Sequence, residues 1–123
     1  MNWILIGVFG AFGAILRYFF HTKLNVGGFP MGTLAVNVIG SFLAGSLLGG
    51  REVFMQWLSP SMTLAIGFGF LGALTTFSTF SVESIRYFEA GNFNMVAANV
   101  AGNVLLSLAF CYIGLKVGLM LTH

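Results

Sequence analysis

Neutral polar side chains recur at helical spacing inside long apolar stretches of this sequence. There are two such sets: Thr33, Asn37 and Ser41, and then Asn99, Asn103 and Ser107. Because residues four apart lie on one face of an α-helix, each set predicts a stripe of hydroxyl and amide donors without a carboxylate. Such a stripe suits an anion that has lost its water, since the donors replace its hydration. The same groups could instead hydrogen-bond one helix to another.

The segment from Gly67 to Ser81, GFGFLGALTTFSTFS, is rich in glycine, serine and threonine. Such residues can interrupt a helix, and free backbone groups are tolerated at membrane depth only inside protein or around an ion. Freed carbonyl oxygens are ligands for a small cation, whereas freed amides favour an anion. The alternative is an intact helix whose hydroxyls bond to the preceding turn.

Two phenylalanines of that segment, Phe77 and Phe80, lie three residues apart. Such pairs usually fill a core, but an aromatic ring has a positive edge that could help to hold a small anion.

Arg17 is expected near a membrane interface, where its side chain can reach water. Glu83 is the one carboxylate placed to act as a proton-coupling group in a transporter.

The composition excludes several classes of protein. The chain has 123 residues, of which 58% are hydrophobic and 7% charged, and its mean hydropathy is +0.96. A soluble domain carries about 25% charged residues, so a water-soluble globular fold is ruled out. The net charge of +2 reflects few charges rather than a basic patch, which gives no support for nucleic-acid binding. No zinc spacing and no set of nucleophile, base and orienting acid occurs, so we do not expect an enzyme.

Four apolar runs are each long enough to cross a membrane, which takes about 20 residues as a helix. They extend from about residue 3 to 20, 31 to 50, 62 to 87 and 94 to 121. Short loops with glycine, proline and asparagine separate them. The sequence therefore predicts an all-α membrane protein with one embedded four-helix domain over residues 1–123, whose third helix is broken at mid-membrane.

The distribution of basic residues hardly favours either orientation. With four spans, Arg51 and Lys116 lie on one side, while Lys23 and Arg86 lie on the other, joined by Arg17 if its side chain reaches that interface. An excess of Lys and Arg normally marks the cytoplasmic side. A chain so weakly biased could insert both ways and pair as an antiparallel homodimer. A small bias could also fix one orientation.

Three segments together resemble the Fluc (CrcB) family of fluoride channels. They are Gly10, Gly13, Ala14, Arg17 and Tyr18 in the first span, GTLAVNVIGSF from Gly32 to Phe42, and GALTTFSTFS from Gly72 to Ser81. The resemblance implies an antiparallel, dual-topology homodimer in the bacterial inner membrane, surrounded by lipid. It implies passive and highly selective export of cytoplasmic fluoride, which lowers fluoride toxicity.

The resemblance also implies roles for particular residues. The rings of Phe77 and Phe80 would face the anion together with Asn37, and Thr33 would accompany Asn37 one turn earlier. Ser78 and Thr79 would add hydroxyls beside the rings. From the polar stripe of the fourth span, rather than from the family, we expect Asn103 and Ser107 to line the fluoride path as well. Arg17 would concentrate anions in an aqueous vestibule. Backbone carbonyls of Gly72 and Thr75 from both subunits would hold a structural sodium ion that is not transported. The family gives no clear role for Asn99 or Asn103.

The main alternative is a small proton-coupled antiporter of the multidrug type. Such a protein is also a dual-topology dimer, but it needs a membrane-buried carboxylate, typically in the first span. The first span of this chain has none, so Glu83 would have to serve.

Overall fold

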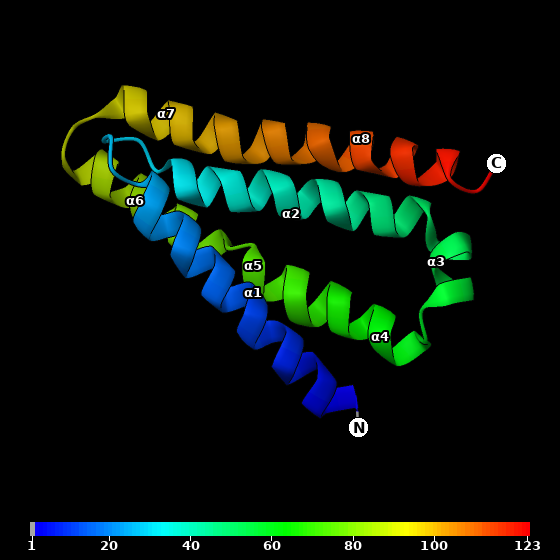
Figure 1. Ribbon diagram of the computed structural model, residues 1–123. Coiled ribbons are helices and arrows are strands. Elements are labelled where there is room, and N and C mark those ends of the chain that lie inside the picture. The colour runs from blue at the N-terminus through cyan, green and yellow to red at the C-terminus, as the bar shows by residue number, and fades with distance from the viewer. Residues whose placement is uncertain (1) are drawn as a thin grey trace.

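The computed structural model describes residues 2–123, and within that range it contains helices and connecting turns but no strand. The elements are α1 (Asn2–Leu24), α2 (Met31–Gly49), α3 (Arg51–Trp57), α4 (Pro60–Leu64), the π-helix η1 (Ala65–Leu71), α5 (Gly72–Leu74), α6 (Phe77–Glu89), α7 (Phe93–Ala101), the π-helix η2 (Gly102–Leu106) and α8 (Ser107–Met120). Figure 1 shows their course, from α1 at one side to the paired α2 and α8 at the other.

Four helical stretches are long and apolar enough to cross a membrane, as the sequence predicts. They cover Asn2–Leu24, Met31–Gly49, Pro60–Glu89 and Phe93–Met120. The first is a turn longer than expected, because no glycine or proline follows Phe20 until Gly27, and the chain turns at Gly28 with a φ of +88°. The second connection is more ordered than expected, since it contains the short helix α3.

Local sequence explains where the later helices begin. Ser59 accepts a hydrogen bond from the Met62 amide, and Pro60 occupies the first turn of α4. Asn92 accepts from the Met95 amide in the same way at the start of α7. These side chains satisfy amides that have no partner within the helix.

Helices α2 and α8 lie side by side and run in the same direction (Figure 1). Glycines on each helix allow this close approach. A methyl group on Gly45 would overlap the carbonyl oxygen of Cys111, and one on Gly114 would overlap that of Phe42. Because lipid provides no hydrophobic drive between helices, such close backbone contact is a main source of their association.

Helix α1 approaches η1 closely in the same way, because Gly13 lies against the backbone of Phe70.

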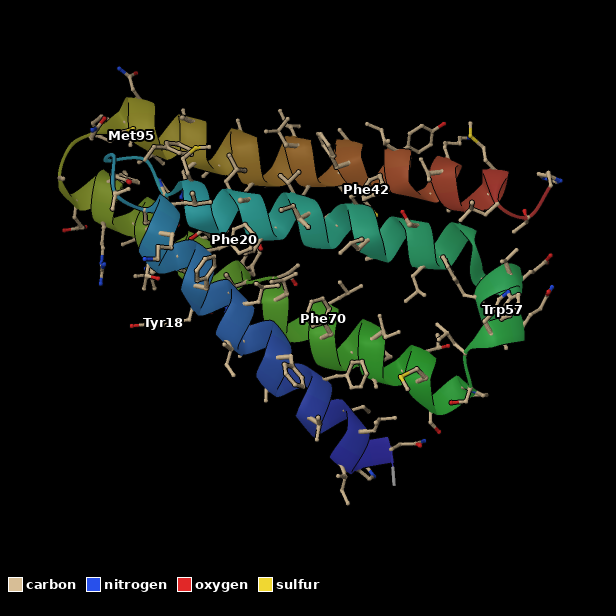
Figure 2. The ribbon with its side chains drawn as sticks, viewed as in Figure 1. Tyr18, Phe20, Phe42, Trp57, Phe70 and Met95 are labelled. Carbon is tan, nitrogen blue, oxygen red and sulfur yellow. The ribbon has the colours of Figure 1, made fainter. Side chains whose placement is uncertain are left out.

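The buried apolar cluster is small and consists of Val36, Leu71 and Leu74. Large apolar side chains cover the outside, and Figure 2 shows Tyr18 and Trp57 projecting from the ribbon. This distribution suits a protein surrounded by lipid.

Candidate functional site

The third helical stretch contains two residues with extended backbone between α5 and α6. Thr75 has a ψ of 153°, and Thr76 has a φ of −150° and a ψ of 119°. Asn37, on α2, satisfies the backbone of this pair from the side. Its Oδ1 accepts from the Thr76 amide at 2.8 Å, and its Nδ2 donates to the Thr76 carbonyl at 3.1 Å. One asparagine therefore supplies both hydrogen bonds that a helix would otherwise supply at Thr76.

Thr76 also begins α6. Its hydroxyl oxygen accepts from the Thr79 amide at 3.2 Å, which is the usual role of a threonine at a helix N-cap. The sequence alone does not distinguish Thr76 from the nearby Thr75 and Ser78, because any of the three residues could cap a helix.

A cavity of about 340 Å³ lies beside Thr76 and contains both phenylalanine rings. We call it the phenylalanine cavity. It is lined by Asn37, Ser41, Thr75, Thr76, Phe77, Phe80, Asn103, Val104, Ser107 and Leu108, none of which carries a charge. Five residues of the predicted fluoride path are therefore brought together here, from α2, α6, η2 and α8.

The two rings meet edge to face, with their centroids 5.3 Å apart and their planes at 71°. Phe80 is buried, whereas Phe77 is 78% exposed on the outside of the single chain. The hydroxyl of Ser107 is buried and has no hydrogen-bond partner among the described residues. Because a buried polar group is normally paired, the donor of this hydroxyl is unused in the single chain.

A second cavity, of about 240 Å³, is also lined by Thr76, and we call it the arginine cavity. It is lined by Ala14, Arg17, Tyr18, His21, Gly32, Thr33, Val36, Thr76 and Thr79. Two residues that the sequence assigned to the path beside the rings, Thr33 and Thr79, line this cavity instead. Ser78 is exposed, and its hydroxyl lies 3.4 Å from that of Thr76.

Thr33 hydrogen-bonds to Glu83 and does not continue the stripe of Asn37 into the phenylalanine cavity. The Thr33 hydroxyl donates to Glu83 Oε1 at 2.7 Å, and Asn25 Nδ2 donates to the same oxygen at 3.4 Å. The other carboxylate oxygen, Oε2, is buried without a partner in the described part of the chain. Glu83 thus connects α6 to α2 and to the turn after α1.

The two residues expected to bind sodium, Gly72 and Thr75, line an open hollow of about 250 Å³ together with Gly40 and Ser41 of α2. In a continuous helix the Gly72 carbonyl would accept from the Thr76 amide, and the Thr75 carbonyl from the Thr79 amide. Both amides are diverted, the first to Asn37 and the second to the Thr76 hydroxyl. The interruption thus releases the two carbonyl oxygens that a hard monovalent cation would need, so these residues fit the ion.

The sequence is also similar to known proteins. A family model described as "CrcB-like protein, Camphor Resistance (CrcB)" matches residues 4–115. A protein of Pseudoalteromonas translucida named "Fluoride-specific ion channel FluC" is 45% identical over 116 residues, which cover 92% of this chain and 96% of that protein. A protein of the same name from Vibrio cholerae is 46% identical over 118 residues, covering 93% and 90% of the two chains. The "Fluoride-specific ion channel FluC 1" of Staphylococcus aureus is 39% identical over 118 residues, covering 96% and 97%. The chain therefore belongs to the CrcB family.

Proposed function

We propose that this chain is a passive fluoride-selective channel that exports fluoride from the cytoplasm and so lowers fluoride toxicity. The relatives named above are fluoride-specific channels, and the four long apolar helices suit a multi-pass protein of the bacterial inner membrane. The observation that carries the proposal is the phenylalanine cavity, which combines an uncharged wall, a ring pair and the unpartnered Ser107 hydroxyl.

Each part of the cavity contributes to the binding of a small anion. A hydroxyl donor replaces part of the hydration that fluoride loses, and the positive edges of Phe77 and Phe80 replace another part. The wall has no carboxylate to repel the anion. The arginine cavity, which shares Thr76 with the phenylalanine cavity, would serve as the vestibule where Arg17 concentrates anions.

No energy coupling is needed for export. Protonated fluoride leaks into a cell and ionises at the higher internal pH. An inside-negative potential then favours exit of the anion by about 2.3 kcal/mol per 100 mV.

We infer that two copies assemble in antiparallel orientation, with the interruption at Thr75 and Thr76 at mid-membrane in each. The nearly even distribution of basic residues supports insertion both ways. The exposed Phe77 ring and the exposed Gly72 backbone leave the ion sites of a single chain open to a partner. The free backbone carbonyl oxygens of Gly72 and Thr75 in both copies would bind one sodium ion, which would hold the two copies together.

The proposal is tested by reconstituting the purified protein into liposomes and recording efflux with fluoride- and chloride-selective electrodes. We expect rapid fluoride efflux and chloride efflux no faster than that of protein-free liposomes. Equal efflux of the two halides would contradict selectivity. A pH-driven cation flux that Glu83→Gln abolishes would favour the antiporter instead.

A further inference from the structure

Asn99 lies at the centre of a buried chain of side-chain amides, and its side chain is 0% exposed. Asn103 Nδ2 donates to the backbone oxygen of Asn99 and to its Oδ1, both at 2.9 Å. The Nδ2 of Asn99 donates in turn to the Ser84 hydroxyl at 3.0 Å and to the Phe80 carbonyl at 3.4 Å. Asn99 therefore joins η2 to α6, at the residue whose ring enters the phenylalanine cavity.

The backbone of Thr76 fixes the direction of this chain at one end. Its amide can only donate, so the Asn37 atom 2.8 Å from it must be the oxygen. The Nδ2 of Asn37 is then left to donate to Asn103 Oδ1, at 2.8 Å. Asn103 consequently turns its own Nδ2 toward Asn99.

Ser84 fixes the same direction at the other end. Its hydroxyl gives its single proton to the Phe80 carbonyl at 2.9 Å, so it can only accept from Asn99. Because both ends impose one direction, reversing any amide would bring two donors or two acceptors together. The chain is fully paired, and such buried networks hold their members in one arrangement.

We propose that Asn99 is a positioning residue that sets where the Phe80 ring stands in the phenylalanine cavity. This inference rests on the proposed function. Asn99 does not line the cavity itself, so it acts through the backbone of Phe80. Phe80 is buried and meets Phe77 edge to face, so a shift of its carbonyl would displace the ring from that geometry.

The role predicts a defined response to substitution. Asn99→Asp keeps the shape of the side chain and the acceptor for Asn103, but it sets an oxygen against the Phe80 carbonyl. Asn99→Ala removes the donors without adding charge. We expect both variants to lower the single-channel fluoride conductance by about tenfold. A tenfold change in rate is what results when the free-energy barrier to ion passage rises by roughly the contribution of one hydrogen bond.

The measurement is single-channel recording in planar bilayers, with the fluoride-to-chloride permeability ratio measured on the same channels. A displaced ring would lower the conductance of each single channel. A loss of folded protein would lower only the number of active channels, so the recording separates the two explanations. Asn94→Asp and Asn94→Ala are the matched controls, since Asn94 lies exposed on the same helix, and both should stay within about twofold of the wild type.

Ser84→Ala removes the other partner of the Phe80 carbonyl and provides a second test if the Asn99 variants do not assemble. In a single chain of bonds, the double variant Ser84→Ala/Asn99→Ala should conduct no worse than Asn99→Ala alone. The inference would be overturned if the conductance losses of the two single variants multiplied in the double variant. It would also be overturned if assembled Asn99→Asp or Ser84→Ala conducted like the wild type. Either result would leave the proposed function intact. An absence of fluoride current in the wild type would overturn the proposed function itself.

Discussion

Replacing Asn37 by leucine should destabilise the folded protein, because this side chain satisfies the extended backbone between α5 and α6. The change removes three hydrogen bonds, two to the backbone of Thr76 and one to Asn103 Oδ1. At about 0.6 kcal/mol for each bond between helices in a membrane, the loss is about 2 kcal/mol. The unpaired Thr76 amide adds a penalty of about 1–3 kcal/mol, so we expect a total of about 3–5 kcal/mol.

The free energy of unfolding can be measured by SDS titration of the protein in mild detergent micelles. Ser41→Ala is the matched control, since Ser41 lies one turn further along α2 and forms no side-chain hydrogen bond within residues 2–123. It should change the free energy of unfolding by less than about 0.5 kcal/mol. If Asn37→Leu were as stable as Ser41→Ala, the reasoning that Asn37 holds the interruption together would be refuted.

The remaining predictions concern the rings, the helix crossing and the sodium ion. Phe77→Ile and Phe80→Ile should each block fluoride efflux from liposomes while the dimer still elutes as one species, and undiminished efflux in both would remove the rings from the mechanism. Gly114→Ala should lower the free energy of unfolding by about 1–3 kcal/mol because its methyl group overlaps the Phe42 carbonyl. Gly7→Ala is its control and should be neutral or slightly stabilising, since beyond the backbone of its own helix turn no other atom lies within 4 Å of the new methyl group. Purification with an organic cation in place of sodium should reduce the dimeric fraction in size-exclusion chromatography, and an unchanged fraction would argue against a bridging ion.

The sequence predicts the helical architecture well, because membrane spans depend on length and hydropathy rather than on distant contacts. The four stretches of the structure fall where the apolar runs fall. Helix α3 is not anticipated, since its few residues, REVFMQW, lie between turn signals and have no long apolar period.

The stripes of polar residues are a harder case for prediction. Spacing correctly puts Asn37 and Ser41 on one face of α2, and both line the phenylalanine cavity. It cannot show that Thr33, on the same stripe, bonds to Glu83, because that partner is 50 residues away in the chain. The role of Thr76 is hidden for the same reason, as it depends on a contact with Asn37 across 39 residues.

The stripe of α7, η2 and α8 shows what periodicity leaves undetermined. Asn99 and Asn103 do share a face, as the interval of four predicts, and their side chains bond to each other along it. A pattern of donors has the same spacing whether the donors face an anion or face one another. In the structure Asn99 and Asn103 bond to each other, while Asn103 also lines the phenylalanine cavity, so the place of Asn103 in the fluoride path stays a prediction.

The pairing of the amides bears on how a small anion can pass through without being trapped. An ion path must bind strongly enough to admit a dehydrated ion and weakly enough to release it. With the amides of Asn37 and Asn103 engaged by backbone and neighbouring side chains, the cavity is left with the hydroxyls of Ser41 and Ser107 and the two phenylalanine rings as partners for an anion. A hydroxyl proton can rotate and follow a moving ion, whereas an amide fixed by two partners cannot. If the chain conducts fluoride as proposed, the rigid amides serve to hold the cavity open, and the serine hydroxyls are left for the ion.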